Sequence, residues 1–112
     1  MSVEIRTSIA AALSTVLGVT GYPKAPTIFR TGDGWPLWGG SERWDGGGPF
    51  VTTWRVVIVL PADEAAADEW IADHLDNLVD ALTPVVHIDR IDPALAQVAG
   101  NDAFRLTFTC RE

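Results

Sequence analysis

The chain has 112 residues, 47% of them hydrophobic and 21% charged, with one cysteine and a formal net charge of −7. These values predict a single domain over residues 1–112 with one modest core, and the acidity opposes affinity for nucleic acid phosphates. No apolar run approaches the roughly 20 residues that cross a bilayer. The first residues lack the pattern of a secretion signal, and the lone Cys110 excludes an internal disulfide framework.

Residues 2–17 are predicted to form a helix, because Ile5, Ile9 and Leu13 begin an apolar pattern with three- and four-residue spacing. Gly18 and the prolines that follow are suitable terminators. A short strand is expected over residues 27–31.

The run from 32 to 49, GDGWPLWGGSERWDGGGP, holds seven glycines and three tryptophans. Glycines favour an irregular backbone, whereas disordered linkers are poor in aromatics. We therefore expect a long recognition loop that contacts a protein partner through Trp35, Trp38, Arg43 and Trp44. The alternative is that some of these indoles pack against the domain's own core.

The second half of the chain predicts a strand over 50–60, a helix over 63–82 and strands over 85–91 and 103–111, with a helical turn over 93–98. Both side-chain rows of the strand over 50–60 are largely apolar, which indicates a central strand covered on both faces. The fold expected is therefore α+β, with a mostly antiparallel sheet packed against two main helices.

Charge is segregated along the chain. The helix over 63–82 carries seven acids and neither lysine nor arginine, and its polar face includes Glu69, Asp73, Asp76 and Asp80. Several arginines occupy the expected strands instead, among them Arg55, Arg105 and Arg111. Acids at this spacing repel one another. The acidic face is therefore either a solvated surface or a subunit contact that meets these arginines in another copy.

Catalytic chemistry has little support in the sequence. His74, His87 and Cys110 do not have the spacing of metal ligands, and no nucleophile elbow or phosphate-binding loop is present. The plentiful acids leave a glycosidase-type carboxylate pair open. We therefore expect that the protein is not an enzyme and that it has no catalytic residue, cofactor or metal site.

The order and size of these elements resemble the tail terminator (tail completion) proteins of long-tailed bacteriophages. The likeness spans essentially the whole chain: the helix around SIAAALSTVLGV, the loop-bearing strand pair ending in TWRVVIVLP, the acidic helix DEAAADEWIADHLDNLVDAL, and the closing strands VVHIDRI and AFRLTFTC. The extended Gly/Trp segment is more elaborate than this pattern requires.

The resemblance implies a structural virion protein without active site or cofactor. Such subunits form a ring, expected to be hexameric, that caps the tail tube, ends its polymerisation and joins the tail to the head connector, while DNA passes through the lumen without specific binding. In such a ring, the acidic face with Glu69, Asp73, Asp76 and Asp80 is a candidate lining of the lumen. The expected partners are other copies, the tail tube protein and the head connector or neck protein, with no membrane. The expected location is the head-proximal end of the tail, after assembly in the host cytoplasm.

Two alternatives to the terminator stay open. One is a head–tail connector or other neck protein. The other is a small binding module whose aromatic loop takes carbohydrate or peptide.

Overall fold

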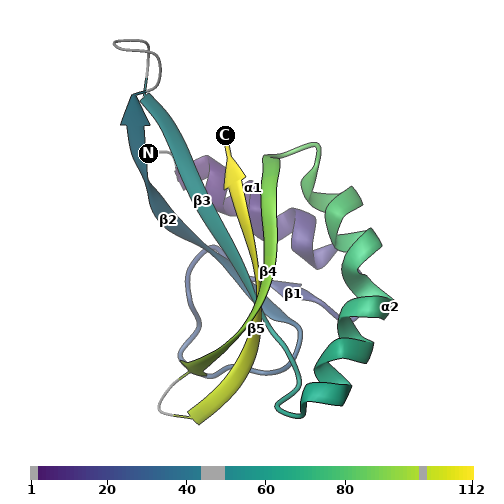
Figure 1. Ribbon diagram of the computed structural model, residues 1–112. Helices are drawn as coiled ribbons and strands as arrows, with labels where there is room; N and C mark the ends of the chain where they lie inside the picture. The colour runs from purple at the N-terminus through teal and green to yellow at the C-terminus, as the bar shows by residue number, and fades with distance from the viewer. Residues whose placement is uncertain (1–2, 44–49, 99–100) are drawn as a thin grey trace.

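A computed structural model describes residues 3–43, 50–98 and 101–112 of the chain (Figure 1). Its elements, in chain order, are α1 (Val3–Ser14), β1 (Thr20–Gly21), β2 (Asp33–Arg43), β3 (Phe50–Val59), α2 (Glu64–Leu82), β4 (His87–Val98) and β5 (Asn101–Arg111). The strands form one sheet in the order β1-β2-β3-β5-β4, in which only β1 and β2 run parallel. The predicted α+β class with a mostly antiparallel sheet is confirmed.

The main core lies between the helices and one face of the sheet. Trp54, Val56 and Ile58 of β3 point to this face, and their partners on β5 are Cys110, Phe108 and Leu106. From the helices, the fully buried side chains are Ile9, Leu13, Leu78 and Leu82. The alternation predicted for β3 and β5 is therefore correct, because apolar residues two apart in a strand share a face.

The other face of β3 is covered over part of its length. Trp35 of β2 lies beside Val57 and Val59, and Tyr22 and Phe29 from the connection after β1 pack against them. The rings of Phe29 and Trp35 stack with centroids 5.0 Å apart. This small second core confirms that β3 is central and is covered on both faces.

Helix α2 begins where the sequence predicts. The carboxylate of Asp63 accepts a 2.9 Å hydrogen bond from the backbone N–H of Ala66, so that Asp63 is the N-cap. At the other end, the hydroxyl of Thr83 donates a 2.7 Å hydrogen bond to the carbonyl of Val79. No helix among the described residues is long and apolar enough to cross a bilayer.

Three predictions about secondary structure are wrong. Residues 27–31 form no strand, and the first strand is instead Thr20–Gly21, which adds to β2 at Asp33 and Gly34. Residues 93–98 do not form a helical turn but continue the strand β4. Because β4 lies at the edge of the sheet, it tolerates Pro93, which has no backbone N–H to donate to a neighbouring strand.

The third error concerns the predicted loop over 32–49, since residues 33–43 form the strand β2. Glycine disfavours a strand locally. However, β2 pairs with β3 from Gly34 to Arg43, and the hydrogen bonds of this pairing stabilise the strand. A β-bulge between Trp38 and Gly40 accommodates Gly39 and Gly40 within the strand. Gly40 has a φ of 108°, which glycine adopts readily. Residues 44–49, including Trp44, lie outside the described part of the chain.

Candidate assembly surfaces

The two described tryptophans of β2 point to opposite faces of the sheet. Trp35 is only 2% exposed and belongs to the small second core. Trp38 is 48% exposed and lies across from the buried Trp54 on the helix side. The expectation that Trp35 faces a partner is therefore corrected. A flat platform of indoles for a planar ligand is also not formed by these two residues.

The end of the β2–β3 hairpin presents a cation and an aromatic ring. The guanidinium of Arg43 lies 4.5 Å from the centroid of Phe50, whose side chain is 61% exposed. Both residues belong to the same side-chain row as Trp38, because Arg43 pairs with Phe50 and Trp38 pairs with Trp54. Phe50 was not predicted as a surface residue, since an aromatic side chain in a strand is more often part of a core.

Arg6 of α1 binds backbone carbonyls near the start of β2, on the edge that does not pair with β3. Its Nη1 donates to the carbonyl oxygens of Pro36 at 3.2 Å and Pro23 at 3.3 Å, and the guanidinium lies 5.0 Å from the ring centroid of Trp54. The Pro36 carbonyl on this edge is therefore satisfied within one copy.

Both long edges of the sheet lack a neighbouring strand in the described structure. On one side, β1 covers only the first two residues of β2. On the other side, β4 pairs with β5 alone. Each of these edge strands contains a proline, Pro36 or Pro93, as edge strands commonly do. An exposed edge is a template for pairing with another chain.

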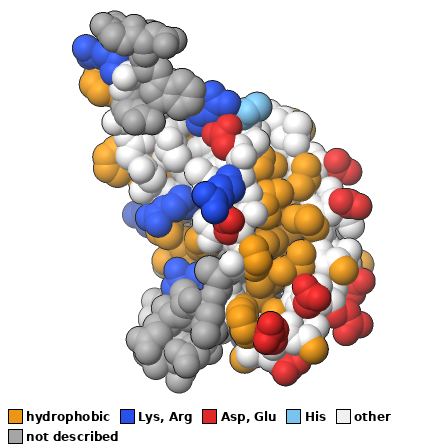
Figure 2. All heavy atoms as spheres, in the orientation of Figure 1, with side chains coloured by type: hydrophobic (Ala, Val, Ile, Leu, Met, Phe, Trp, Pro, Cys, Tyr) orange, Lys and Arg blue, Asp and Glu red, His pale blue; other side chains and the backbone are white. Residues whose placement is uncertain are grey.

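The acids singled out on α2 are all at the surface. Glu69, Asp73, Asp76 and Asp80 are exposed, and none of them forms a salt bridge within the described residues. Acidic side chains follow α2 along one side of the molecule in Figure 2, and hydrophobic side chains are exposed between α2 and the sheet.

The arginines lie on the sheet face turned away from the helices. Arg55 is exposed there, opposite Thr109, and Arg105 is half-buried opposite Val59. Arg111 donates to Asp89 at 2.8 Å and 3.1 Å. The fold therefore does not bring these arginines to the acidic face of α2 within one copy.

Two arginine–carboxylate ion pairs lie at the β4 side of this face, and the first of them joins Arg111 to Asp89. The hydrogen bond from Arg111 lowers the pKa of Asp89, and the nearby charges of Arg111 and His87 act in the same direction, against a smaller desolvation effect that raises it. The second pair joins Arg90 to Asp92 at 2.7 Å. Two of the arginine charges on this face are thus neutralised locally.

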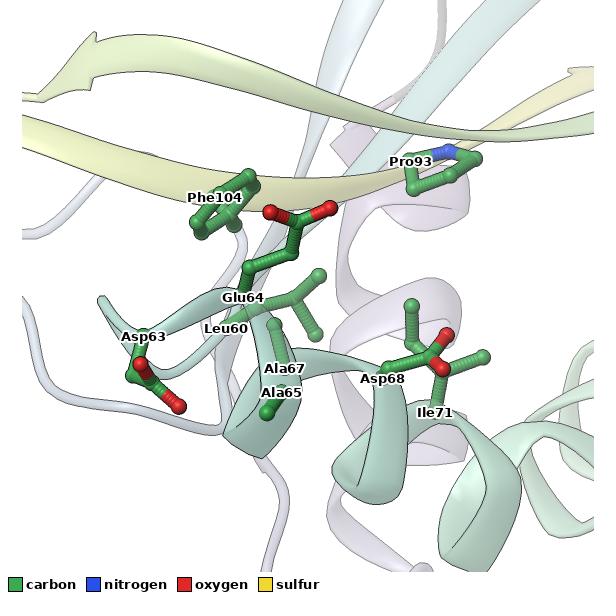
Figure 3. A pocket seen from close by; sticks show the side chains of 9 residues that line it. All are labelled: Leu60, Asp63, Glu64, Ala65, Ala67, Asp68, Ile71, Pro93 and Phe104. Atoms are coloured by element: carbon green, nitrogen blue, oxygen red, sulfur yellow. The ribbon is translucent and has the colours of Figure 1, made fainter.

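A groove of about 490 Å³ separates the second half of α2 from the residues that follow α1. Two further grooves lie between α2 and β4. The larger of these two, of about 690 Å³, is lined by apolar and acidic side chains and lies between the start of α2 and the β4–β5 pair (Figure 3). The carboxylate of Glu64 points toward Phe104 and Pro93 in this groove, whereas that of Asp63 points away from it. The smaller groove, of about 460 Å³, is mostly apolar and lies between the end of α2 and the start of β4; its lining residues are Val79, Thr83, Pro84, Val85, Val86, His87, Ile88 and Glu112.

Of the side chains considered for chemistry, His87 lies at the surface with its Nε2 3.3 Å from Asp89, and His74 and Cys110 pack against neighbouring groups. His74 stacks on Trp70 at 4.1 Å, and its Nδ1 lies 2.8 Å from the Trp70 carbonyl. Burial raises the pKa of the Cys110 thiol to about 12, with the charge of Asp89 acting in the same direction, so the reactive thiolate is scarce. Across residues 3–43, 50–98 and 101–112, no three potential metal ligands come together.

No protein-family model matches this chain, and a search of curated proteins finds no match either.

Proposed function

We propose that this chain is the subunit of a ring-forming virion protein: a tail terminator that caps the tail tube, ends its polymerisation and joins the tail to the head connector. The observation that carries the proposal is the pair of unpaired sheet edges, on β2 and β4, at opposite sides of one sheet. The resemblance of the whole sequence to tail terminators supplies the biological setting.

The directions of the strands suit a head-to-tail contact. Counting from β2 through β3 and β5 to β4, every neighbour is antiparallel, so β2 and β4 run in opposite directions. When copies are related by rotation about an axis along the strands, β4 of one copy meets β2 of the next in antiparallel pairing. A contact between two different surfaces of the same chain closes into a ring when the rotation allows.

The layers of the subunit favour one orientation in such a ring. Both helices cover the same sheet face (Figure 1). The bulkier layer needs the longer circumference, so we place the helices outside and the sheet toward the lumen. The acids of α2 then belong to the outer surface of the ring, rather than to its lumen or to the contact between copies.

The sheet face would then meet the DNA that passes through the ring. Salt bridges from Arg111 to Asp89 and from Arg90 to Asp92 reduce the number of free cations on it. Affinity for phosphates grows with the number of lysines and arginines that neutralise them. A partly neutralised lining therefore lets DNA move without being held.

The end of the β2–β3 hairpin suits contact with a second protein. At this end of the sheet, β2 and β3 extend beyond β5 and β4, in a molecule that measures 45 Å along its longest axis (Figure 1). In the proposed ring, Arg43 and Phe50 lie at one rim. We assign this rim to the tail tube protein.

Mass measurement by multi-angle light scattering tests the proposal, with and without the tail tube protein. We expect a closed multimer, and six copies of 12.1 kDa would give about 73 kDa. Binding to the tube protein would favour a terminator, whereas a ring that binds only connector proteins would favour a neck protein. A mass of 12.1 kDa under every condition would refute ring formation.

A further inference from the structure

We infer that Trp38 of one copy docks in the apolar groove of the next copy between the end of α2 and the start of β4, where the two free sheet edges pair. The inference rests on the proposed ring and specifies how neighbouring copies recognise each other. The occupant of the groove is thus a second copy of this chain.

The register of the sheet places Trp38 and this groove at the same level. Trp38 is paired with Trp54, Trp54 with Cys110, and Cys110 with Ile88. Ile88 lines the groove. The edge of β2 before this level is already occupied by β1 and Arg6, so pairing between copies begins near Trp38. Antiparallel pairing of this part of β2 with the start of β4 of the next copy, without a shift along the strands, brings Trp38 to the groove.

The side-chain rows agree with this placement. Residues paired across a sheet point to the same face, and Trp54 and Cys110 both point into the helix-side core. Trp38 and Ile88 therefore also point to the helix side. The groove opens on this side, because Val79 of α2 and Val85 contribute to its lining. The indole of Trp38 would meet aliphatic side chains, which favours transfer of its exposed apolar surface from water.

The edges also share an irregularity at this level. The bulge in β2 falls between Trp38 and Gly40, and the bulge in β4 falls between Ile88 and Arg90. A bulge bends a strand and increases its local twist. Two edges that bend at the same level can follow each other, whereas a foreign strand has no reason to share this irregularity.

Cysteine cross-linking tests the register directly. Leu37 and Arg90 occupy one level, through Arg55 and Thr109. Within a copy, three strand spacings of about 4.8 Å separate them, roughly 14 Å in all, which exceeds the reach of a disulfide. Only neighbouring copies can therefore join Leu37→Cys to Arg90→Cys. The native Cys110 is buried and does not compete.

We expect oxidation of the double variant Leu37→Cys/Arg90→Cys to give a ladder of covalent multimers, with the bond between positions 37 and 90 mapped by mass spectrometry of peptides. The matched control is Leu37→Cys/Asp92→Cys, in which Asp92 is on the same face one level further along, opposite Thr107. It should cross-link much less. Equal or preferred linkage to position 92, or linkage between two copies of position 37, would overturn the inferred register.

Trp38→Ala tests the energetic role of the indole. We expect the association of copies to weaken roughly 30-fold or more, as for a central interface tryptophan, while Trp38→Phe keeps part of the affinity. The cross-linking experiment removes no aromatic residue, so it decides the matter even if Trp38→Ala folds poorly.

The outcomes separate this inference from the proposed function. A wild-type ring that is insensitive to Trp38→Ala and gives no 37–90 cross-link would overturn the inference and leave the ring proposal intact. Rings that form the cross-link but bind neither tube nor connector protein would support the inference and overturn the tail assignment.

Discussion

Replacing Trp35 with alanine tests whether the glycine- and tryptophan-rich segment belongs to the domain's own core. The indole is 2% exposed, stacks on Phe29 and packs against Val57 and Val59. A buried tryptophan removes about 200 Å² from water, which at about 25 cal/mol per Å² is an upper estimate of roughly 5 kcal/mol. Substitutions of this kind cost about 3–5 kcal/mol.

The expected change in melting temperature follows from the size of the domain. An unfolding entropy of about 2.1 cal/mol/K per residue gives roughly 0.24 kcal/mol/K for a chain of this length. Trp35→Ala should therefore lower Tm by roughly 13–21 °C. Trp38→Ala is the matched comparison: about half of its side chain is already exposed, so the loss should be about 2 kcal/mol and roughly 8 °C.

Far-UV circular dichroism melts and urea titrations at a protein concentration where the chain is monomeric provide the measurement, because association would itself raise Tm. Trp35→Phe keeps an aromatic ring on Phe29 and should lose less stability than Trp35→Ala. If Trp35→Ala melts within a few degrees of the wild type, or if Trp38→Ala costs more than Trp35→Ala, the assignment of Trp35 to the core and of Trp38 to the surface is wrong.

Three further predictions concern other parts of the fold. The buried Cys110 thiol should resist a thiol reagent at pH 8 in the native protein and react when the chain is unfolded; rapid labelling of the native protein would contradict its burial. The free energy of unfolding should also fall as pH rises above 9, because unfolding lowers the pKa of this thiol from about 12 to 9.0. Because the pKa of Asp89 is lowered in the folded state, its pairing with Arg111 should stabilise the protein above the unfolded pKa and lose this effect as pH falls. The difference in unfolding free energy between wild type and Asp89→Asn should then shrink below about pH 4, and a difference independent of pH would exclude this cause. Gly21→Ala should lower the free energy of unfolding by about 1–3 kcal/mol, because a Cβ there would overlap the backbone carbonyl of Ala10. Urea titration measures this loss, and unchanged stability would show that β1 does not lie this close to α1.

Much of the fold could be predicted because local pattern and tertiary environment agree. The alternation of Trp54, Val56 and Ile58 requires a strand with one face in the core, and the spacing from Ala67 to Leu82 together with the cap at Asp63 requires a helix. Such patterns are properties of neighbouring residues, and no distant contact is needed to recognise them.

The candidate assembly surfaces were predicted less well, because the sequence does not show which strands lie at the edges. Trp35 and Trp38 have similar neighbours in sequence, yet one is in a core and the other is half exposed. The difference arises from the period of two in β2, which places the two indoles on opposite faces, and from Tyr22 and Phe29, which pack on the face of Trp35. Phe50 was missed for the same reason, since its exposure depends on where the helices end.

By itself, the sequence determined the class of fold, both helices, the central strand and the charge segregation, because each depends on spacing or composition within a short stretch. Only the tertiary structure decided that a glycine-rich stretch becomes a strand, since hydrogen bonds to β3 outweigh its weak local preference. It also decided which strand edges remain open, because strand order is set by contacts between residues far apart in the chain.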